Sequence, residues 1–166
     1  MRLDAARLEE LRRALILDSA PERSFDDITR LLATTLAVPI TMVNLLDAER
    51  DWFKSCVGLQ QTQSAKVTSF CEAFFSTNCD TIVVEDTLLD PRFETHPMVS
   101  GRPFIRFYAA ARLIVRGQTV GTLCADDIRP RQLSVDQLEY LRTQASAAVE
   151  LIGRRSTGME HARGKG

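Results

Sequence analysis

Two acidic and two basic side chains border one polar loop of the sequence and could form a site for a charged molecule. They are Asp86, Asp90, Arg92 and Arg106. Arginine carries a planar fork of N–H donors that matches carboxylate and phosphate oxygens. The same residues could instead form ion pairs that hold the loop against a neighbouring sheet. The sequence leaves both interpretations open.

The cysteines offer a second kind of chemistry, because a thiolate is a nucleophile. Thiol catalysis needs one accessible thiolate and a resolving partner within reach. Cys71 lies near the start of a predicted short helix, and its pKa would be lowered if it lay at the helix N-terminus. Cys124 alternates with apolar residues along a predicted strand, which is typical of a small core residue.

No metal or cofactor site is predicted. None of the four cysteines stands in a C-x-x-C pair, and only His96 and His161 could join them as ligands. A haem group would need an axial ligand, and His96 lies beside Pro97 in a polar loop, where a solvated histidine is expected.

Aromatic side chains beside the polar loop favour a small-molecule pocket. Phe104 and Tyr108 stand where the loop leads into two extended segments, Ile105–Val115 and Gln118–Asp126, joined by a tight turn at Arg116-Gly117. Aromatic walls around a few polar groups are typical of ligand pockets, although periodicity does not separate a pocket wall from the core. The predicted lining residues are Phe53, Cys71, Phe74, Asp86, Arg92, Phe93, Phe104, Arg106, Tyr108 and Cys124.

Composition indicates one ordinary globular domain. The chain has 166 residues, of which 45% are hydrophobic and 26% charged. A net charge of −1 gives no electrostatic argument for binding nucleic acid or an acidic membrane. No apolar run reaches the roughly 18–20 residues that span a bilayer, and the start of the chain does not resemble a secretory signal. We therefore expect a cytoplasmic protein.

Apolar spacing predicts helices in the first part of the chain. Ala5–Leu17 carries leucines on one stripe, so we place an N-terminal helix within residues 1–18. A second helix is predicted to start at a capping arrangement of Ser24 and Asp27 and to end before Pro39.

Hairpin strands with helices before, between and after them favour an α+β fold with one antiparallel sheet. The predicted early strands are Ile40–Leu46, Trp52–Val57 and Thr81–Glu85, and a short helix is predicted over Ser69–Thr77. We expect the terminal helices on one face of the sheet. Loops and the short helix would cover the other face, where a pocket would form.

The C-terminal helix has the clearest local signals. A Ser-x-x-Gln capping box at Ser134 and Gln137 predicts a helix over residues 134–153, and the chain after it, residues 154–166, is predicted to be disordered. A narrow apolar seam on this helix either packs on the protein's own sheet or joins two copies, and the small alanines favour a homodimer. The seam residues are Leu138, Leu141, Ala145, Ala148 and Ile152.

An ordered series of short motifs resembles the GAF domain of bacterial sensor kinases and diguanylate cyclases. The motifs are Leu15-Ile16-Leu17-Asp18, Phe25-Asp26, Val38-Pro39-Ile40, Asp47-Ala48-Glu49-Arg50, Trp52-Phe53-Lys54-Ser55, Ser69-Phe70-Cys71, Val84-Glu85-Asp86, Asp90-Pro91-Arg92-Phe93, Arg106-Phe107-Tyr108 and Gly121-Thr122-Leu123-Cys124. The resemblance covers about residues 14–153. It implies a central antiparallel sheet of about six strands, a ligand pocket between sheet and loops, and dimerisation through terminal helices.

The resemblance also defines alternatives for the function. The series departs from the family pattern at Ala73, where a histidine is common, and no Cys-His pair for bilin attachment exists. No cyclic-nucleotide signature is found. Some family members reduce free methionine sulfoxide with thiols, but they carry a further cysteine in the loop before the late strands, and none lies between Cys79 and Cys124.

The main expectation is therefore a stand-alone regulatory module, residues 1–153, that binds a small molecule and signals through its terminal helices. It would not be an enzyme, and a partner protein or the dimer would carry the output, since no kinase, cyclase or DNA-binding segment fits in the remaining residues. The alternatives are a thiol-dependent free methionine sulfoxide reductase and a ligand-free dimerisation scaffold.

Overall fold

A six-stranded antiparallel sheet forms the centre of the protein in a computed structural model that describes the backbone of residues 1–163 and the side chains of residues 1–158. The strand order is β3-β2-β1-β6-β5-β4. The predicted α+β class and the sheet of about six strands are confirmed. The strands are β1 (Ile40–Leu46), β2 (Arg50–Val57), β3 (Gln63–Ala65), β4 (Thr81–Val84), β5 (Phe107–Val115) and β6 (Gln118–Asp127).

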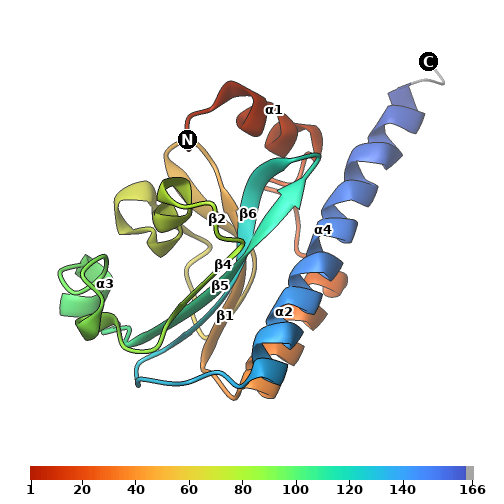
Figure 1. Ribbon diagram of the computed structural model, residues 1–166. Helices are drawn as coiled ribbons and strands as arrows, with labels where there is room; N and C mark the ends of the chain where they lie inside the picture. Colours follow the sequence, from red (N-terminus) through yellow and green to blue (C-terminus); the bar gives the residue numbers. More distant parts are fainter. Residues whose placement is uncertain (164–166) are drawn as a thin grey trace.

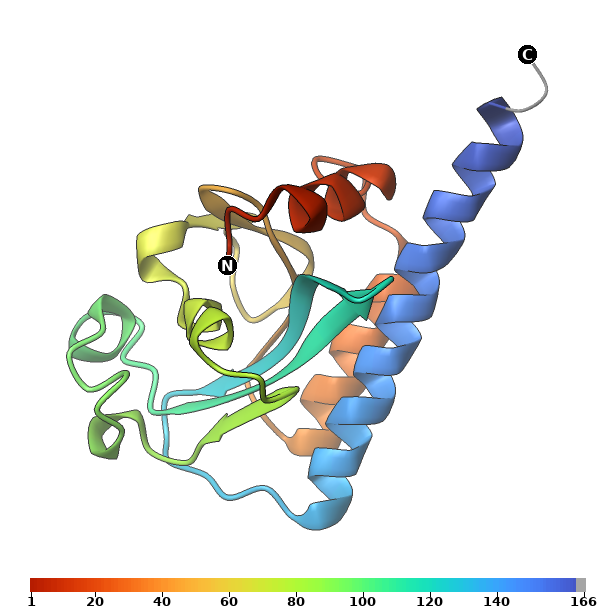
Figure 2. The same ribbon diagram turned by 45° about the horizontal axis from the view of Figure 1, so that its top comes forward.

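Helices and loops cover the two faces of the sheet differently. Two long helices, α2 and α4, lie side by side on one face, while short helices and loops cover the other (Figures 1 and 2). The α1 helix lies across one end of the sheet, where Arg7 donates to the carbonyl oxygens of Leu46 and Thr119. The helices are α1 (Ala5–Arg13), α2 (Arg23–Leu36), α3 (Pro97–Ser100) and α4 (Val135–Arg163), with 3-10 helices η1 (Lys66–Thr68), η2 (Phe70–Ser76) and η3 (Thr87–Leu89).

The two N-terminal helices begin and end differently from the prediction. The α1 helix ends at Arg13 because Leu15 and Asp18 have positive φ angles of 45° and 58°, which an α-helix cannot contain. The capping arrangement expected at Ser24 is wrong, since the N-cap of α2 is Glu22, two residues earlier. Glu22 accepts ion pairs from Lys54 and Arg155, so tertiary contacts hold this helix start in place of a side-chain cap.

The predicted capping box of α4 is confirmed. The backbone N–H of Gln137 donates to Ser134 Oγ at 3.1 Å, and the backbone N–H of Ser134 donates to Gln137 Oε1 at 3.0 Å. The helix does not end at residue 153, however, and the disorder predicted for 154–166 is wrong as far as Arg163. Arg155 donates to the carbonyl oxygens of Ala14 and Leu15, and these tertiary hydrogen bonds hold the start of the extension. Residues 164–166 lie outside the described part of the chain.

The apolar seam of α4 packs inside a single copy of the chain. Leu141 and Ala148 are 0% exposed and Ile152 is 1% exposed, all in the cluster between α2, α4 and the sheet. Leu141, Ala145, Ala148 and Ile152 are buried against their own domain and Leu138 is half-buried beside them, so they offer little apolar surface to a second copy. The homodimer interface through these five residues stays a prediction.

Alternation along the strands separates two layers of core. In β5, Phe107, Ala109 and Ala111 face α2 and α4, whereas Tyr108 and Ala110 face the loop layer. In β6 the same period of two sends Leu123 toward the helices and Cys124 toward the loops. Tyr108 and Cys124 therefore lie together on the face of the sheet that the loops cover.

Candidate functional site

The loop-covered face of the sheet contains a cavity of about 40 Å³. One water molecule needs roughly 10–15 Å³ on the same scale, so this space holds a small molecule of a few atoms. Strands β1, β2, β5 and β6 form its floor, and the segments around η1, η2 and α3 form its cover. The polar side chains that line it include Asn44, Asp51, Ser69, Cys71, Cys124 and Asp126, and the apolar ones include Ile40, Met42, Phe53, Phe70, Ile105 and Tyr108.

Two cysteines meet at the centre of this cavity wall. The Cys71 and Cys124 sulfur atoms lie 3.6 Å apart without a disulfide, and Thr122 Oγ1 is 3.0 Å from the first and 3.1 Å from the second. The Tyr108 hydroxyl lies 3.2 Å from Cys71 Sγ, and Asn44 Nδ2 donates to the same sulfur at 3.4 Å. Burial and the hydrogen bond to Cys71 raise the pKa of the Cys124 thiol well above its ordinary value, so Cys124 stays protonated near neutral pH.

A saturated carboxylate stands at one end of the cavity. Asp51 Oδ1 accepts from Arg2 Nη2 at 2.5 Å, and Asp51 Oδ2 accepts from Ser69 Oγ at 2.5 Å and from Asn44 Nδ2 at 2.9 Å. Because a carboxylate can only accept hydrogen bonds, the Asn44 amide must turn its Nδ2 toward Asp51, and this fixes its orientation. Arg2 therefore brings the N-terminal segment into direct contact with the cavity wall.

Two other acceptor groups in the cavity wall lack a partner among the described residues. Asn44 Oδ1 and Asp126 Oδ1 are buried without a hydrogen bond there, although most buried polar atoms in native proteins are paired. Burial raises the pKa of Asp126 to about 8, since no cation compensates its charge. The cavity thus offers acceptors that a bound molecule could satisfy.

An aromatic stack connects the cavity wall to the loop layer. The ring of Phe70 stacks on Tyr108 with centroids 5.2 Å apart and on His96 with centroids 4.2 Å apart. Burial lowers the pKa of His96 and raises that of Tyr108 well above its ordinary value. His96 also caps α3 through Nδ1, which accepts from the backbone N–H of Met98 at 3.1 Å, so this histidine has a structural role.

Comparison with known proteins settles the family. A profile of the GAF domain matches residues 20–152. The chain belongs to the GAF domain family. A cyclic di-GMP phosphodiesterase from Pseudomonas aeruginosa is 33% identical over 142 residues, which cover 82% of this chain. This chain spans only 24% of the length of that enzyme.

Solved structures agree on the GAF fold. The GAF domain of an Acinetobacter phosphoenolpyruvate-protein phosphotransferase superimposes with a TM-score of 0.67 at 18% identity, covering 92% of this chain and 95% of that one. A free methionine-R-sulfoxide reductase from Neisseria meningitidis gives a TM-score of 0.65 at 16% identity, covering 92% and 89%. At these identities the likeness concerns the fold alone.

No helix among the described residues has the length and apolar character needed to cross a bilayer.

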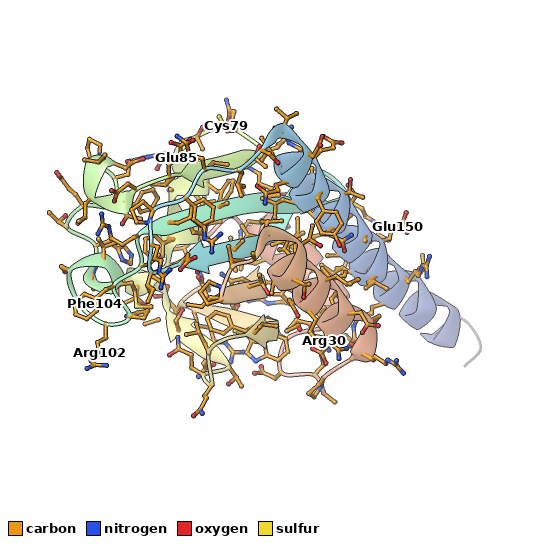
Figure 3. All side chains as sticks on the ribbon, turned by 90° about the horizontal axis from the view of Figure 1, so that it is seen from below. Arg30, Cys79, Glu85, Arg102, Phe104 and Glu150 are labelled. Carbon is orange, nitrogen blue, oxygen red and sulfur yellow. The ribbon has the colours of Figure 1, made fainter. Side chains whose placement is uncertain are left out.

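Four of the ten residues predicted to line the GAF pocket do line the cavity, and they are Phe53, Cys71, Tyr108 and Cys124. Phe74 and Phe93 are buried in the same apolar cluster without reaching the cavity. Phe104 is 51% exposed and lies beside Arg102 at the outer edge of the loop layer, away from α2 and α4 (Figure 3).

The charged residues of the polar loop form ion pairs outside the cavity. Arg106 donates from Nε and Nη2 to both oxygens of Asp86, at 3.0 and 2.9 Å, which lowers the pKa of this carboxyl. Arg92 pairs in the same way with Asp90, at 3.0 and 2.6 Å. The structure therefore favours the interpretation in which these pairs hold the loop in place.

Sequence reasoning missed seven polar residues of the cavity, namely Asn44, Asp51, Gln61, Ser64, Thr68, Ser69 and Asp126. Two of them carried a usable signal. Asn44 is the only amide or charged residue in the apolar run Ile40–Leu46, and Asp126 lies two positions after Cys124, on the same face of its strand. The burial of Asp51 depends on Arg2, 49 residues away, and no local pattern indicates it.

Proposed function

We propose that this GAF domain is a regulatory module whose interior cavity binds a small molecule and transmits the bound state to the terminal helices. The observation that carries the proposal is a cavity under the loop layer with two buried acceptors, Asn44 Oδ1 and Asp126 Oδ1, that the protein leaves without hydrogen bonds. Buried unpaired acceptors are costly in a folded protein, so a bound donor would stabilise the occupied state.

A route from the cavity to the N-terminal helix supports the regulatory part. Asn44 and Ser69 donate to Asp51, and Asp51 accepts from Arg2. The carbonyl oxygen of Arg2 in turn accepts from the guanidinium of Arg7 in α1. A molecule that contacts Asn44 differently in two states would shift the balance between two positions of α1. A cytoplasmic location and a partner protein that receives this change belong to the same proposal.

Blocking the cavity mouth tests the proposal. Leu59 lines the cavity from a half-buried loop position, so Leu59→Trp should occupy the space with little damage to the sheet. Leu89→Trp, at a side chain that is 82% exposed, is the matched control. Native mass spectrometry of each freshly purified protein should show a retained molecule with the wild type and the control only. Thermal shifts with amines, amino acids and nucleobases should follow the same pattern.

A ligand-free scaffold would give a different result. Neither the wild type nor the variants would then carry a bound molecule, and no compound would shift the melting temperature of the wild type more than that of Leu59→Trp. This outcome would leave the domain as an assembly unit without a sensing role.

The adjacency of Cys71 and Cys124 favours a second candidate, a thiol-dependent sulfoxide reductase. Two thiols could pass two electrons and two protons to a sulfoxide, giving a sulfide, water and a Cys71–Cys124 disulfide, and the 3.6 Å sulfur separation suits such a bond. The raised pKa of Cys124 opposes it, because a neutral thiol is a poor nucleophile. Reduction of free methionine sulfoxide with dithiothreitol as reductant tests it. Turnover that disappears in Cys71→Ser would establish the enzyme, and no turnover in the wild type would remove it.

A further inference from the structure

Asp126 is a buried carboxyl group without a partner in the described part of the chain, in contrast with the residue beside it. Asp126 is 6% exposed, and its Oδ1 atom has no hydrogen bond. Asp127, on the opposite face of β6, is also buried but pairs with the guanidinium of Arg131 and accepts from the backbone N–H of Arg129. At the end of β6, the Asp127 carboxylate is therefore paired within the fold, whereas the Asp126 carboxyl group faces the cavity.

The ionisable groups that line the cavity make it unfavourable for an anionic ligand. Among the described residues that line it, none is Lys or Arg, and its two ionisable carboxyl groups are Asp51 and Asp126. The Asp51 carboxylate already accepts three hydrogen bonds, one of them from Arg2, so it has little capacity left. An entering carboxylate or phosphate would find no cation and would lose its hydration, which is unfavourable in a buried site.

The walls near Asp126 suit an aliphatic chain. Asp126 lies opposite Ile40 in β1 and Tyr108 in β5, and the next inward position of β1 is Met42, opposite Cys124. Phe53, opposite Asn44, continues this apolar surface farther along the cavity. Aromatic rings also attract an ammonium group that lies over their faces.

We propose that Asp126 binds the ammonium group of a short primary amine, whose alkyl chain lies against Ile40, Met42 and Tyr108. This inference rests on the proposed function, since it names the ligand class of the same cavity. Asn44 stands four positions along β1 from Ile40, the residue opposite Asp126, so its backbone lies about 13 Å farther along the same cavity at about 3.3 Å per residue.

Binding of the ammonium group is coupled to release of the proton from the Asp126 carboxyl group. The titratable groups that face Asp126 are Cys56 of β2, Tyr108 of β5 and Cys124 of β6. Burial raises the pKa of Cys56 to about 11 and the pKa values of Tyr108 and Cys124 well above their ordinary values, so all three stay neutral between pH 6 and pH 9. Asp51 keeps its pairing with Arg2.

Asp126 therefore dominates the pH dependence in this range. Its carboxyl group, with a pKa of about 8, must lose its proton before it can pair with a cation. The affinity for an alkylammonium ion should rise by about tenfold per pH unit below this pKa and level off above it. An aliphatic amine remains protonated over the whole range, since its pKa is close to that of lysine, about 10.4.

Three probes of equal length test the charge preference, namely butylammonium, butanol and butyrate. The full chain is prepared with ¹³C-methyl methionine, because Met42 and Met98 line the cavity while Met1 is 91% exposed and reports unspecific effects. Each probe is titrated into the millimolar range, since a molecule of this size binds no more tightly than micromolar. The variant Asp126→Asn removes the charge with nearly the same shape, and Asp80→Asn, at an exposed side chain, is the matched control.

We expect butylammonium to shift the Met42 and Met98 signals of the wild type and of Asp80→Asn, with an affinity about fivefold higher at pH 8 than at pH 7, because the ionised fraction of a group with a pKa of about 8 rises by that factor. Asp126→Asn should lose this preference, and butyrate should leave both signals unchanged. Saturation of the Met42 shift by butanol in the wild type and in Asp126→Asn alike would show that the cavity still accepts a small molecule when the charge is absent.

Two results would overturn the inference and separate it from the proposed function. Equal binding of butylammonium and butanol to the wild type and Asp126→Asn, or stronger binding of butyrate, would refute recognition of an ammonium group while leaving a ligand-binding cavity. If none of the three probes shifted Met42 or Met98 in the wild type, the cavity would be closed to small molecules, and both proposals would fall.

Discussion

The guanidinium group of Arg2 donates to the Asp51 carboxylate at 2.5 Å, across 49 positions of the sequence. The side chains are 2% and 3% exposed, so this is a buried ion pair. Further donor atoms of Arg2 contact the carbonyl oxygens of Asp47 and Arg50 and the carboxylate of Glu72. These contacts therefore attach the segment before α1 to the wall of the cavity, so that a displacement of Asp51 would also displace this segment.

Replacement of Arg2 by methionine should destabilise the domain. It would leave Asp51 buried without its cation, and breaking one partner of a buried pair costs about 3–5 kcal/mol. Urea unfolding measures the loss. Arg12→Met, at an exposed position of α1, removes the same charge and should change the stability little. Equal stabilities of the two variants would contradict a buried pair.

Stability should fall as the pH rises through the titration of Asp126. Its pKa is 3.8 in an ordinary environment and about 8 in the folded protein, so between these values the folded state holds a proton that the unfolded state releases. The contribution is fully present below the lower value and lost as pH approaches the higher one. Asp126→Asn stays neutral throughout.

The stability advantage of Asp126→Asn over the wild type should therefore grow by up to about 1.4 kcal/mol per pH unit between about pH 5 and pH 8 and then level off. Urea unfolding of both proteins at each pH provides the comparison. An advantage that stays constant across this range would mean that Asp126 is ionised in the folded protein from the start.

Truncation of the α4 seam should act on the stability of the single domain. Leu141 is 0% exposed within one chain, and Leu141→Ala should cost about 2–5 kcal/mol of folding free energy through lost burial and a residual cavity. Val135→Ala, at an 85% exposed position of the same helix, is the control. Sedimentation of both variants should match the wild type. A Leu141→Ala protein that dissociates from a dimer and keeps its urea midpoint would restore the seam as an interface.

Removal of the loop arginines should leave the cavity functional. Arg92 and Arg106 are engaged by Asp90 and Asp86 away from the cavity, so the shift of the Met42 signal by butylammonium should survive Arg92→Ala and Arg106→Ala. Resistance of the loop to proteolysis should fall in both variants, because the ion pair that holds it is gone. Loss of the Met42 response in a variant that is still folded would place these arginines in the binding site.

Local patterns predicted most of the secondary structure. The strand β1 matches the apolar run Ile40–Leu46 at both ends, and the capping box at Ser134 and Gln137 starts α4 where expected. Such signals act between residues a few positions apart, so they can be read from the sequence. The start of α2 and the extension of α4 depend instead on Glu22, which pairs with both Lys54 and Arg155.

The sequence by itself determined the fold family, the antiparallel sheet and the presence of Cys71, Tyr108 and Cys124 on its loop-covered side. Only the tertiary structure decided which charged groups are compensated. Asp86 pairs with Arg106 and Asp90 with Arg92, while Asp51 pairs with Arg2 from the distant N-terminus. Asp126 has no such partner within the described chain. The physical reason is that desolvation and pairing depend on what surrounds a side chain in space, which periodicity along the chain does not encode.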